Sequence, residues 1–398
     1  MAEELNKGIA IIIDEQIDDV QSGDLIIKIA AKVKEQGIPF CSFTTLKDAR
    51  ACLKNFLQVN FLILDWQLIV SNGAPEQIKD ANAKENIKFI EEFRQVSSAP
   101  IFIFSSLAEV DIKDYFVRFG KGILKDNTKK DFILIKTKSS VSENNDLFSS
   151  VEIWLKSNPA IYTLKKWENA FLEAKNKAFS HLFTISPIWS KILWDTATVD
   201  QIDESTNLND IIYKSIKSRT SVIDFDKDII DSIPDAEIDA DEIKSVIIAA
   251  NYLSNENISI NDVQPGDIFK VEKKYYINFR PVCDTVISRP ACDKLLYCLK
   301  GDILSAGQVK DRYNEKYKML IDKNNEIILY GIDGKKFVNF PLNSFEVFEY
   351  DKIKDKRIQR LLPPYSNYLQ QSVSSYLQRV GLPRTPHVII ENALPQQT

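Results

Sequence analysis

The sequence has few residues of the types that most often carry catalysis and bind metals. Its 398 residues include only two histidines, His181 and His387, and five cysteines that form no Cys-x-x-Cys pair. A zinc site is therefore not expected, because its ligands come mostly from these two residue types. The odd number and scattered spacing of the cysteines also argue against a disulfide framework. Any acid–base chemistry then falls to carboxylates.

Long apolar runs and an excess of positive charge are missing as well. No run approaches the roughly 18 apolar residues of a membrane-spanning helix, and the opening MAEELNKGIAIII has no basic region before its apolar residues. We therefore expect a cytoplasmic protein with no membrane partner. The formal net charge is −5. Because nucleic-acid binders usually present a basic face, nucleic acid is not expected as a partner.

What is present is an ordinary globular composition, 44% hydrophobic and 27% charged, with a clear pattern in the first ~150 residues. Short apolar runs typical of buried strands alternate there with amphipathic segments typical of helices. The expected strands are 8–13, 38–43, 61–64, 99–106 and 132–136. The expected helices are 23–37, 46–57, 85–96, 108–119 and 145–157. Five β/α units predict an α/β fold with a doubly wound parallel sheet.

The pattern changes twice further along the chain. Helical periodicity continues at 163–183, 207–219 and 240–254, and the acidic stretch 224–242 is either a loop or a short helix with a charged rim. From about residue 258, short β-type segments separated by turns predict a small antiparallel, barrel-like domain, and a last helix is expected at 365–381. The predicted domains are 1–158 (α/β), 159–257 (helical connector), 258–350 (small β domain) and 351–398 (C-terminal helix and tail).

Polar side chains stand at the ends of the predicted parallel strands. Asp14 and Glu15 follow the first strand, and Asp65 ends the third in the run NFLILDWQL. Ser105 ends the fourth strand and Lys136 the fifth. Because the carboxyl ends of parallel strands meet at one edge of a sheet, where ligands bind near the topological switch point, we expect these groups to lie close together.

These residue types together indicate phosphoryl transfer to a carboxylate. Three neighbouring carboxylates repel one another unless a cation neutralises them, and Mg²⁺ binds through one or two carboxylates plus waters. A hydroxyl and an ammonium stabilise phosphoryl oxygens, and an aspartate can be the covalent nucleophile. The alternative interpretation is that strand ends of any α/β fold carry polar residues.

The N-terminal ~150 residues resemble the response-regulator receiver domain. The matching segments are IIIDEQ, LILDWQ, FIFSS and ILIK. The resemblance implies that Asp65 accepts a phosphoryl group and that Ser105 and Lys136 contact it. It further implies that Mg²⁺ is bound by Asp14, Glu15, Asp65 and the main-chain carbonyl of Gln67.

The sequence departs from the receiver pattern in several places. Thr137 stands where receivers usually have a proline after the lysine, and Ile133 stands where the aromatic switch residue is expected. The segment 70–84 is interpreted as an insertion after Asp65. Lys125, in GILK, competes with Lys136 for the role of the lysine, and FILIK is the better strand. These departures argue against the usual aromatic switching mechanism of receivers in this protein, but not against phosphoryl transfer to Asp65.

The expected function is that of a response-regulator-like signalling protein in which phosphorylation of Asp65 controls a C-terminal output or adaptor region. The implied donor is a histidine-kinase-like ATPase, a homodimer is left open, and enzymatic activity is not expected. The arrangement, including WENAF and RLLPPY, resembles receiver-bearing proteins of bacterial conflict loci, which suggests phage defence. The alternatives are a degenerate receiver that serves only as a scaffold, and a gate on a C-terminal barrel that acts on nucleic acid. For the latter, QPGDIF resembles the opening of SH3-like barrels, including plasmid-maintenance toxin ribonucleases.

Overall fold

The computed structural model describes residues 7–18, 25–55, 59–68, 74–121, 133–142, 147–200, 203–233, 239–285, 293–316, 319–320 and 325–378. The chain divides into two compact units. The first unit comprises Met1–Pro187 and Ile211–Asp235, and the second comprises Ile188–Asp210 and Ala236–Thr398. In this division the helical region 159–257 is shared between the two units.

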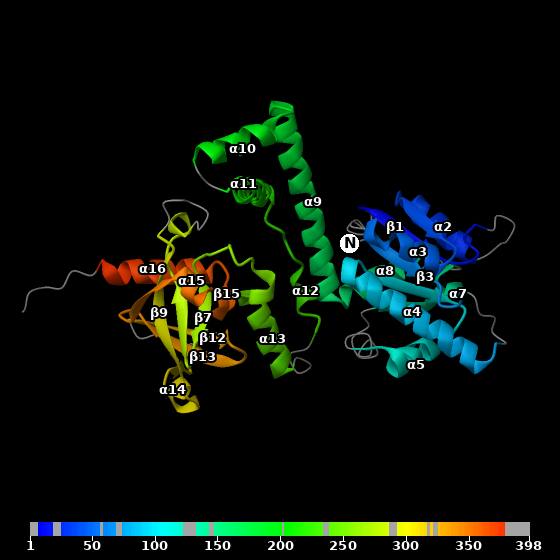
Figure 1. Ribbon diagram of the computed structural model, residues 1–398. Helices are drawn as coiled ribbons and strands as arrows, with labels where there is room; N and C mark the ends of the chain where they lie inside the picture. The colour runs from blue at the N-terminus through cyan, green and yellow to red at the C-terminus, as the bar shows by residue number, and fades with distance from the viewer. Residues whose placement is uncertain are drawn as a thin grey trace, which may run out of the picture. The chain divides into compact units, whose positions relative to one another are not determined.

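A five-stranded parallel sheet forms the centre of the first unit (Figure 1). Its strands are β1 (Ile9–Ile13), β2 (Phe40–Phe43), β3 (Val59–Leu64), β4 (Ile101–Ser105) and β5 (Ile133–Thr137). They lie in the order β2-β1-β3-β4-β5, and every neighbouring pair is parallel. The predicted α/β fold class is thereby confirmed.

Helices cover both faces of this sheet. They are α2 (Leu25–Glu35), α3 (Leu46–Cys52), α4 (Glu76–Val96), α5 (Glu109–Phe119), α7 (Lys138–Ser142) and α8 (Leu147–Lys156). Successive residues of a strand point to opposite faces. Ile11 and Ile13 accordingly pack with α3, α4 and α5, whereas Ala10 and Ile12 pack with α2, α7 and α8. Burial on both faces explains why the strands are continuous apolar runs.

Three further helices belong wholly or partly to the first unit: α9 (Pro159–Ile185), α11 (Glu204–Arg219) and α12 (Lys227–Ile230). Ala174 and Ala178 of α9 pack against Ile216 of α11 in a small apolar cluster. The helix α10 (Trp189–Val199) lies in the second unit. None of the helices among the described residues is long and apolar enough to cross a membrane.

Two expectations for the first unit need revision. The segment 70–84, interpreted as an insertion, is largely the start of α4, which begins at Glu76. The helix expected at 46–57 ends earlier, as α3 followed by the 3₁₀ turn Leu53–Asn55. Lys125, the alternative candidate for the site lysine, lies outside the described residues.

A curled antiparallel sheet forms the centre of the second unit (Figure 1). Its strands are β6 (Tyr252–Ser254), β7 (Asp267–Val271), β8 (Lys274–Asn278), β9 (Leu295–Ile303), β12 (Glu326–Ile332), β13 (Lys336–Pro341), β14 (Phe345–Glu349) and β15 (Arg357–Leu361). The order is β12-β13-β9-β8-β7-β15-β6, with β14 also paired to β9. A separate two-stranded ladder joins β10 (Tyr313–Asn314) to β11 (Met319–Leu320).

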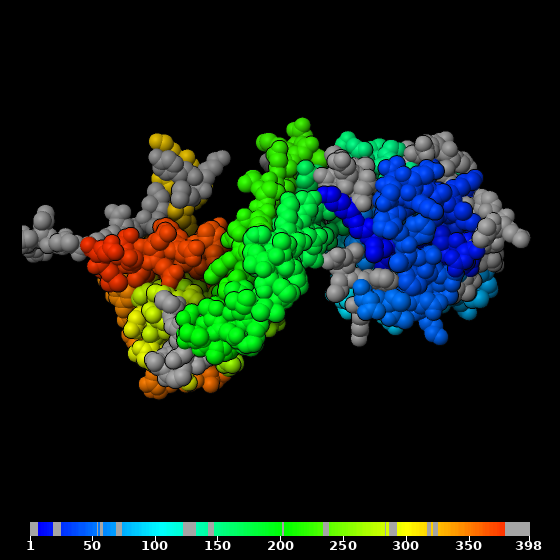
Figure 2. Space-filling model, turned by 90° about the horizontal axis from the view of Figure 1, so that it is seen from above, coloured from blue at the N-terminus to red at the C-terminus, as the bar shows by residue number. Residues whose placement is uncertain are grey.

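Short helices and turns complete the second unit. They are α13 (Ala240–Asn251), α14 (Ala306–Lys310), α15 (Tyr350–Ile353), α16 (Tyr365–Leu377) and the 3₁₀ turns Asn255–Asn257, Val282–Asp284 and Lys354–Lys356. Ile268 of β7 faces the larger core and Phe269 the smaller one. The helix α16 lies over the sheet (Figure 2). Its residues Leu369 and Val373 belong to the larger core.

The sequence missed part of this sheet. Residues 252–254, predicted as the end of a helix, form β6. The strands β6 and β15 extend the sheet on either side of the range 258–350 that was predicted for the β domain. The tail 382–398 lies outside the described residues.

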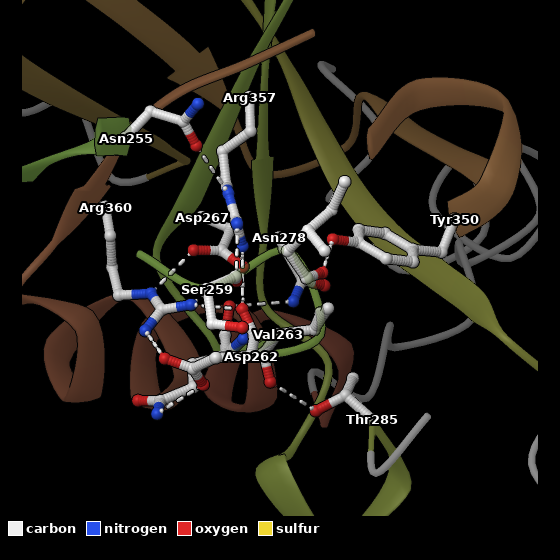
Figure 3. Close-up of polar contacts among 12 residues, drawn as sticks. Asn255, Ser259, Asp262, Val263, Asp267, Asn278, Thr285, Tyr350, Arg357 and Arg360 are labelled. Atoms are coloured by element: carbon white, nitrogen blue, oxygen red, sulfur yellow. Dashed lines mark hydrogen bonds and ion pairs between the residues drawn. The ribbon is translucent and has the colours of Figure 1, made fainter. Parts of the chain in front are cut away.

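A buried network of charged side chains joins β15 to the loop before β7 (Figure 3). The carboxylate of Asp267 accepts hydrogen bonds from Nε of Arg360 at 2.6 Å and from Nη1 of Arg357 at 3.3 Å. Arg360 also donates from Nη1 to the carboxylate of Asp262 at 2.6 Å. Because Asp267 is fully buried and the two arginines are 4% and 5% exposed, these charges have left water and depend on one another.

The same arginines hold the irregular segment 255–265 in place. Arg357 donates to the Asn255 side chain at 2.9 Å, to the Ser259 carbonyl at 2.8 Å and to the Asp262 carbonyl at 2.7 Å. The Thr285 hydroxyl donates to the Val263 carbonyl at 3.1 Å. Side chains thus satisfy main-chain carbonyls that no strand or helix pairs, as buried backbone groups require.

The substitution Asp267→Asn tests this network. We expect it to lower the free energy of unfolding of the second unit by about 3–5 kcal/mol, because two buried guanidinium groups lose their shared carboxylate. Urea denaturation of the full chain, with hydrogen exchange assigning the transition to residues 239–378, measures the loss. Asp302→Asn is the control, since the Lys274–Asp302 pair is half-exposed or more on both sides and should cost at most about 1 kcal/mol. Equal losses in the two variants would contradict the network's role.

A second test uses Gly266, which precedes Asp267 with a φ of +93°. A Cβ added there would lie 2.4 Å from the Leu361 carbonyl oxygen, whereas one added at Gly334, also at +93°, meets nothing within 4 Å. We expect Gly266→Ala to destabilise the protein by about 2 kcal/mol or more beyond Gly334→Ala, since both changes share the backbone strain and only one adds a clash. Thermal unfolding of both variants checks the difference.

Candidate functional site

Asp14 and Asp65 lie side by side at the point where the strand order reverses. The sheet order places β1 next to β3, and Asp14 and Asp65 directly follow these two strands. The main-chain N–H of Asp65 donates to the Ile13 carbonyl at 2.9 Å, which fixes the register of the two strand ends. The switch point of a doubly wound sheet is where such folds bind ligands. The predicted meeting of these two carboxylates is thus seen in the structure.

An ammonium group bridges the two carboxylates. Nζ of Lys138 lies 2.6 Å from Oδ2 of Asp14 and 2.9 Å from Oδ2 of Asp65. The other oxygens accept main-chain hydrogen bonds, Asp14 from Gln16 at 2.9 Å and Asp65 from Gln67 at 3.1 Å. The side chains of Asp14, Asp65 and Lys138 are only 0%, 6% and 10% exposed. We call these three residues the acidic triad.

The ammonium that contacts Asp14 and Asp65 is that of Lys138 and not, as predicted, that of Lys136. The ammonium of Lys136 lies on the half-exposed flank of β5, 3.8 Å from a carboxylate oxygen of Glu109. Strand β5 continues to Thr137, which pairs with Ser105 of β4. The first residue beyond the strand is therefore Lys138, which begins α7. Because its side chain starts past the strand end, it can turn back over the edge of the sheet.

The other predicted residues stand around the acidic triad. Ser105 is fully buried at the end of β4, and its hydroxyl accepts a hydrogen bond from the Leu107 N–H at 3.3 Å. The Ser106 hydroxyl donates to the side-chain carbonyl of Gln67, which joins the loops after β4 and β3. Glu15 is exposed next to Asp14. The structure thus brings Asp14 and Asp65 into one cluster and places Ser105, Gln67 and Glu15 at neighbouring strand ends.

The electrostatics of the site favour added positive charge. Burial raises the pKa of Asp14, and the charge of Asp65 raises it further, although Lys138 partly offsets both. The pKa of Glu15 is raised by partial burial and then by repulsion from Asp65 and Asp14. Burial alone would lower the pKa of Lys138, but Asp65 and Asp14 outweigh it and the net shift is upward. The single positive charge of Lys138 therefore only partly offsets the repulsion among Asp14, Glu15 and Asp65.

The donor set fits magnesium only in part. Within the described portions of the chain, no three Asp, Glu, His or Cys side chains gather closely enough to hold a metal ion. Asp14 and Asp65 supply two carboxylates, and Mg²⁺ commonly uses one or two carboxylates together with waters. The residual negative charge of Asp14, Glu15 and Asp65 also suits a divalent cation. The residues present therefore fit a two-carboxylate site better than the predicted three-carboxylate one.

Comparison with known proteins adds little to this geometry. No protein-family model matches the chain, and no curated protein matches it. Among solved structures, a two-component response regulator from Clostridium difficile is similar at 16% identity and a TM-score of 0.24, over 37% of this chain and 96% of that one. A fusion protein carrying a yeast trimeric coiled-coil segment is similar at 14% identity and a TM-score of 0.26, over 45% of this chain and 96% of that one. At such TM-scores neither similarity supports an inference about function.

Lys138→Met tests the charge balance of the acidic triad. We expect it to cost about 3–5 kcal/mol of unfolding free energy at neutral pH, because two buried carboxylates lose their shared cation. Burial already raises the pKa of Asp14, and loss of the Lys138 ammonium raises it further above the unfolded value of about 4. A raised carboxyl pKa contributes stability at low pH that is lost as the pH rises through the folded pKa. The cost should therefore shrink as the pH falls toward about 4.

Urea unfolding at several pH values between acidic and neutral measures this trend. Lys136→Met is the matched control, since Lys136 is half-exposed and its ion pair is long. It should change the unfolding free energy by less than about 0.5 kcal/mol at every pH. A cost for Lys138→Met that does not vary with pH would show that the two carboxylates do not depend on the ammonium.

Proposed function

We propose that the first unit is a receiver-like phosphoryl acceptor in which Asp65 is the acceptor and Lys138 the phosphoryl-contacting lysine. The observation that carries the proposal is the acidic triad at the switch point of the sheet. A buried pair of carboxylates with a single ammonium is costly to maintain as a purely structural feature. Carboxylates with a perturbed pKa, such as Asp14 here, cluster at functional sites.

The proposed step is the formation of an acyl phosphate. A carboxylate oxygen of Asp65 attacks the phosphorus of the donor, and a new P–O bond forms. At the same time the bond from phosphorus to the donor's leaving group breaks, and that group departs with the electron pair. The ammonium of Lys138 lies 2.9 Å from Asp65 Oδ2. From there it would stabilise the negative charge on the oxygens of the transferred phosphoryl group. The Ser105 hydroxyl, on the adjacent strand, is proposed as a second contact.

Magnesium belongs to this proposal as the cofactor. Asp14 and Asp65 would hold it together with the Gln67 main-chain carbonyl and waters, and Glu15 would add negative charge beside the ion. When bound, Mg²⁺ neutralises the oxygens of the group being transferred. In the cell we propose a histidine-kinase-like ATPase as the donor, and a C-terminal region that acts as output or adaptor. A role in phage defence and a homodimeric assembly are wider proposals that rest on the resemblance and the sequence alone.

The test is labelling with Mg²⁺ and acetyl phosphate, followed by intact mass measurement. We expect the wild-type chain and Lys136→Met to gain one phosphoryl group and Asp65→Asn to gain none. Lys138→Met should be labelled about 10²-fold more slowly, the usual effect of removing one oxyanion-stabilising donor. Circular dichroism of each variant shows whether the fold is kept.

Two results would count against the proposal. Equal labelling of the wild type and Asp65→Asn would place any phosphoryl group elsewhere. No labelling of the wild type by acetyl phosphate, together with no Asp65-dependent response to beryllofluoride, would favour the scaffold alternative. Cleavage of RNA or DNA by the full chain, independent of Asp65, would instead favour the alternative of a nucleic-acid-acting barrel.

A further inference from the structure

Both polar groups of the peptide bond between Trp66 and Gln67 are hydrogen-bonded to side chains. Its N–H, from Gln67, donates to Asp65 Oδ1 at 3.1 Å. Its carbonyl, from Trp66, accepts hydrogen bonds from Nδ2 of Asn82 and Nδ2 of Asn86, each at 2.7 Å. The two asparagines are four residues apart on α4 and so lie on one face of that helix. One rigid peptide plane thus connects the acceptor carboxylate to α4.

The burial of Asn86 indicates that this contact is specific. Asn86 is fully buried, and across the described residues its side-chain oxygen has no hydrogen-bond partner. A buried amide oxygen left without a partner destabilises the folded protein. Turning the amide over would place that oxygen against the Trp66 carbonyl, so the orientation is fixed by the bond to Trp66. Asn86 therefore leaves its own side-chain oxygen unpaired while its Nδ2 group holds the Trp66 carbonyl in place.

The side chain of Trp66 reaches a second helix. Trp66 is 1% exposed, and its ring centroid lies 5.3 Å from that of Phe116 and 6.1 Å from that of Tyr115, both on α5. One residue next to the acceptor thus contacts α4 through its main chain and α5 through its side chain. By contrast, Ile133 and Ile135, which lie three residues before Lys136 and Lys138, are buried and aliphatic. No aromatic switch is present at either position.

We propose that Asn82 and Asn86 are positioning residues that couple Asp65 to α4, in place of an aromatic switch on β5. The inference rests on the proposed function. A phosphoryl group on Asp65 changes the charge and reach of the oxygen that accepts the Gln67 N–H. The peptide plane then turns, the Trp66 carbonyl moves with it, and α4 shifts relative to α5. A local change in charge is thereby converted into a displacement of a packed helix.

The experiment measures hydrogen exchange in α4, residues 76–96, with and without Mg²⁺ and beryllofluoride. The variants are Asn82→Ala, Asn82→Ala/Asn86→Ala and, as the control, Gln95→Ala, an exposed position on the same helix. Fluorine NMR of the full chain measures the beryllofluoride adduct directly, with Asp65→Asn as the blank. Asn82 is only half-buried, so its single variant keeps the test valid if the double variant does not fold.

We expect wild type and Gln95→Ala to form the adduct and to change the exchange of α4. Asn82→Ala should form the adduct within about 3-fold of the wild-type affinity and lose at least half of the α4 response, and the double variant should lose all of it. An adduct with an unchanged α4 response in both asparagine variants overturns the inference and leaves the proposed function standing. Absence of an adduct on the wild type overturns the proposed function, and the inference falls with it.

Discussion

The first unit depends on where the ammonium of Lys138 lies. It contacts one oxygen of Asp14 and one of Asp65, the residues that directly follow β1 and β3. Without it, two buried carboxylates would face each other at the edge of a sheet that is apolar on both faces, and such a pair does not stay ionised unpaired. Because Lys138 begins α7, the same contact ties β5 and its helix to that edge. One ammonium group therefore joins the ends of β1, β3 and β5 and fixes the position of the Asp65 carboxylate.

Most of this unit can be read from the sequence, since burial on both faces makes each strand a continuous apolar run. The lysine could not, because strand ends are uncertain by a residue or two and the identity of the site lysine depends on that margin. In the run ILIKTK, ending the strand at Lys136 makes that residue the site lysine, whereas ending it at Thr137 makes the next residue, Lys138, the first beyond the sheet. The rule that identified Asp14 and Asp65 also identifies Lys138 once the strand end is known.

Two further errors involve polar residues whose hydrogen-bond partners the sequence does not reveal. Strand β15 contains Arg357 and Arg360, whose burial depends on Asp267 some 90 residues earlier, as the hydrogen bonds at separations of 90 and 93 residues show. A period-two apolar pattern cannot reveal a strand whose inward side chains are charged. Asn82 likewise lies in the segment 70–84, for which the sequence predicts an insertion and no helix. Its partner is a main-chain carbonyl, which has no signature in the sequence.

The Asp267 network of the second unit and the acidic triad of the first differ in their balance of positive and negative charge. In the second unit, two aspartates face two arginines, and the guanidinium groups donate to Asp262, Asp267 and main-chain carbonyls, so the charges balance. In the first unit, Asp14, Glu15 and Asp65 lie near a single ammonium, that of Lys138, and burial followed by repulsion between the carboxylates raises the pKa of Asp14 and of Glu15. A site that is short of positive charge, at a strand edge where ligands bind, can gain stability from what binds to it. On that ground the acidic triad, and not the larger arginine network, is the better candidate for chemistry.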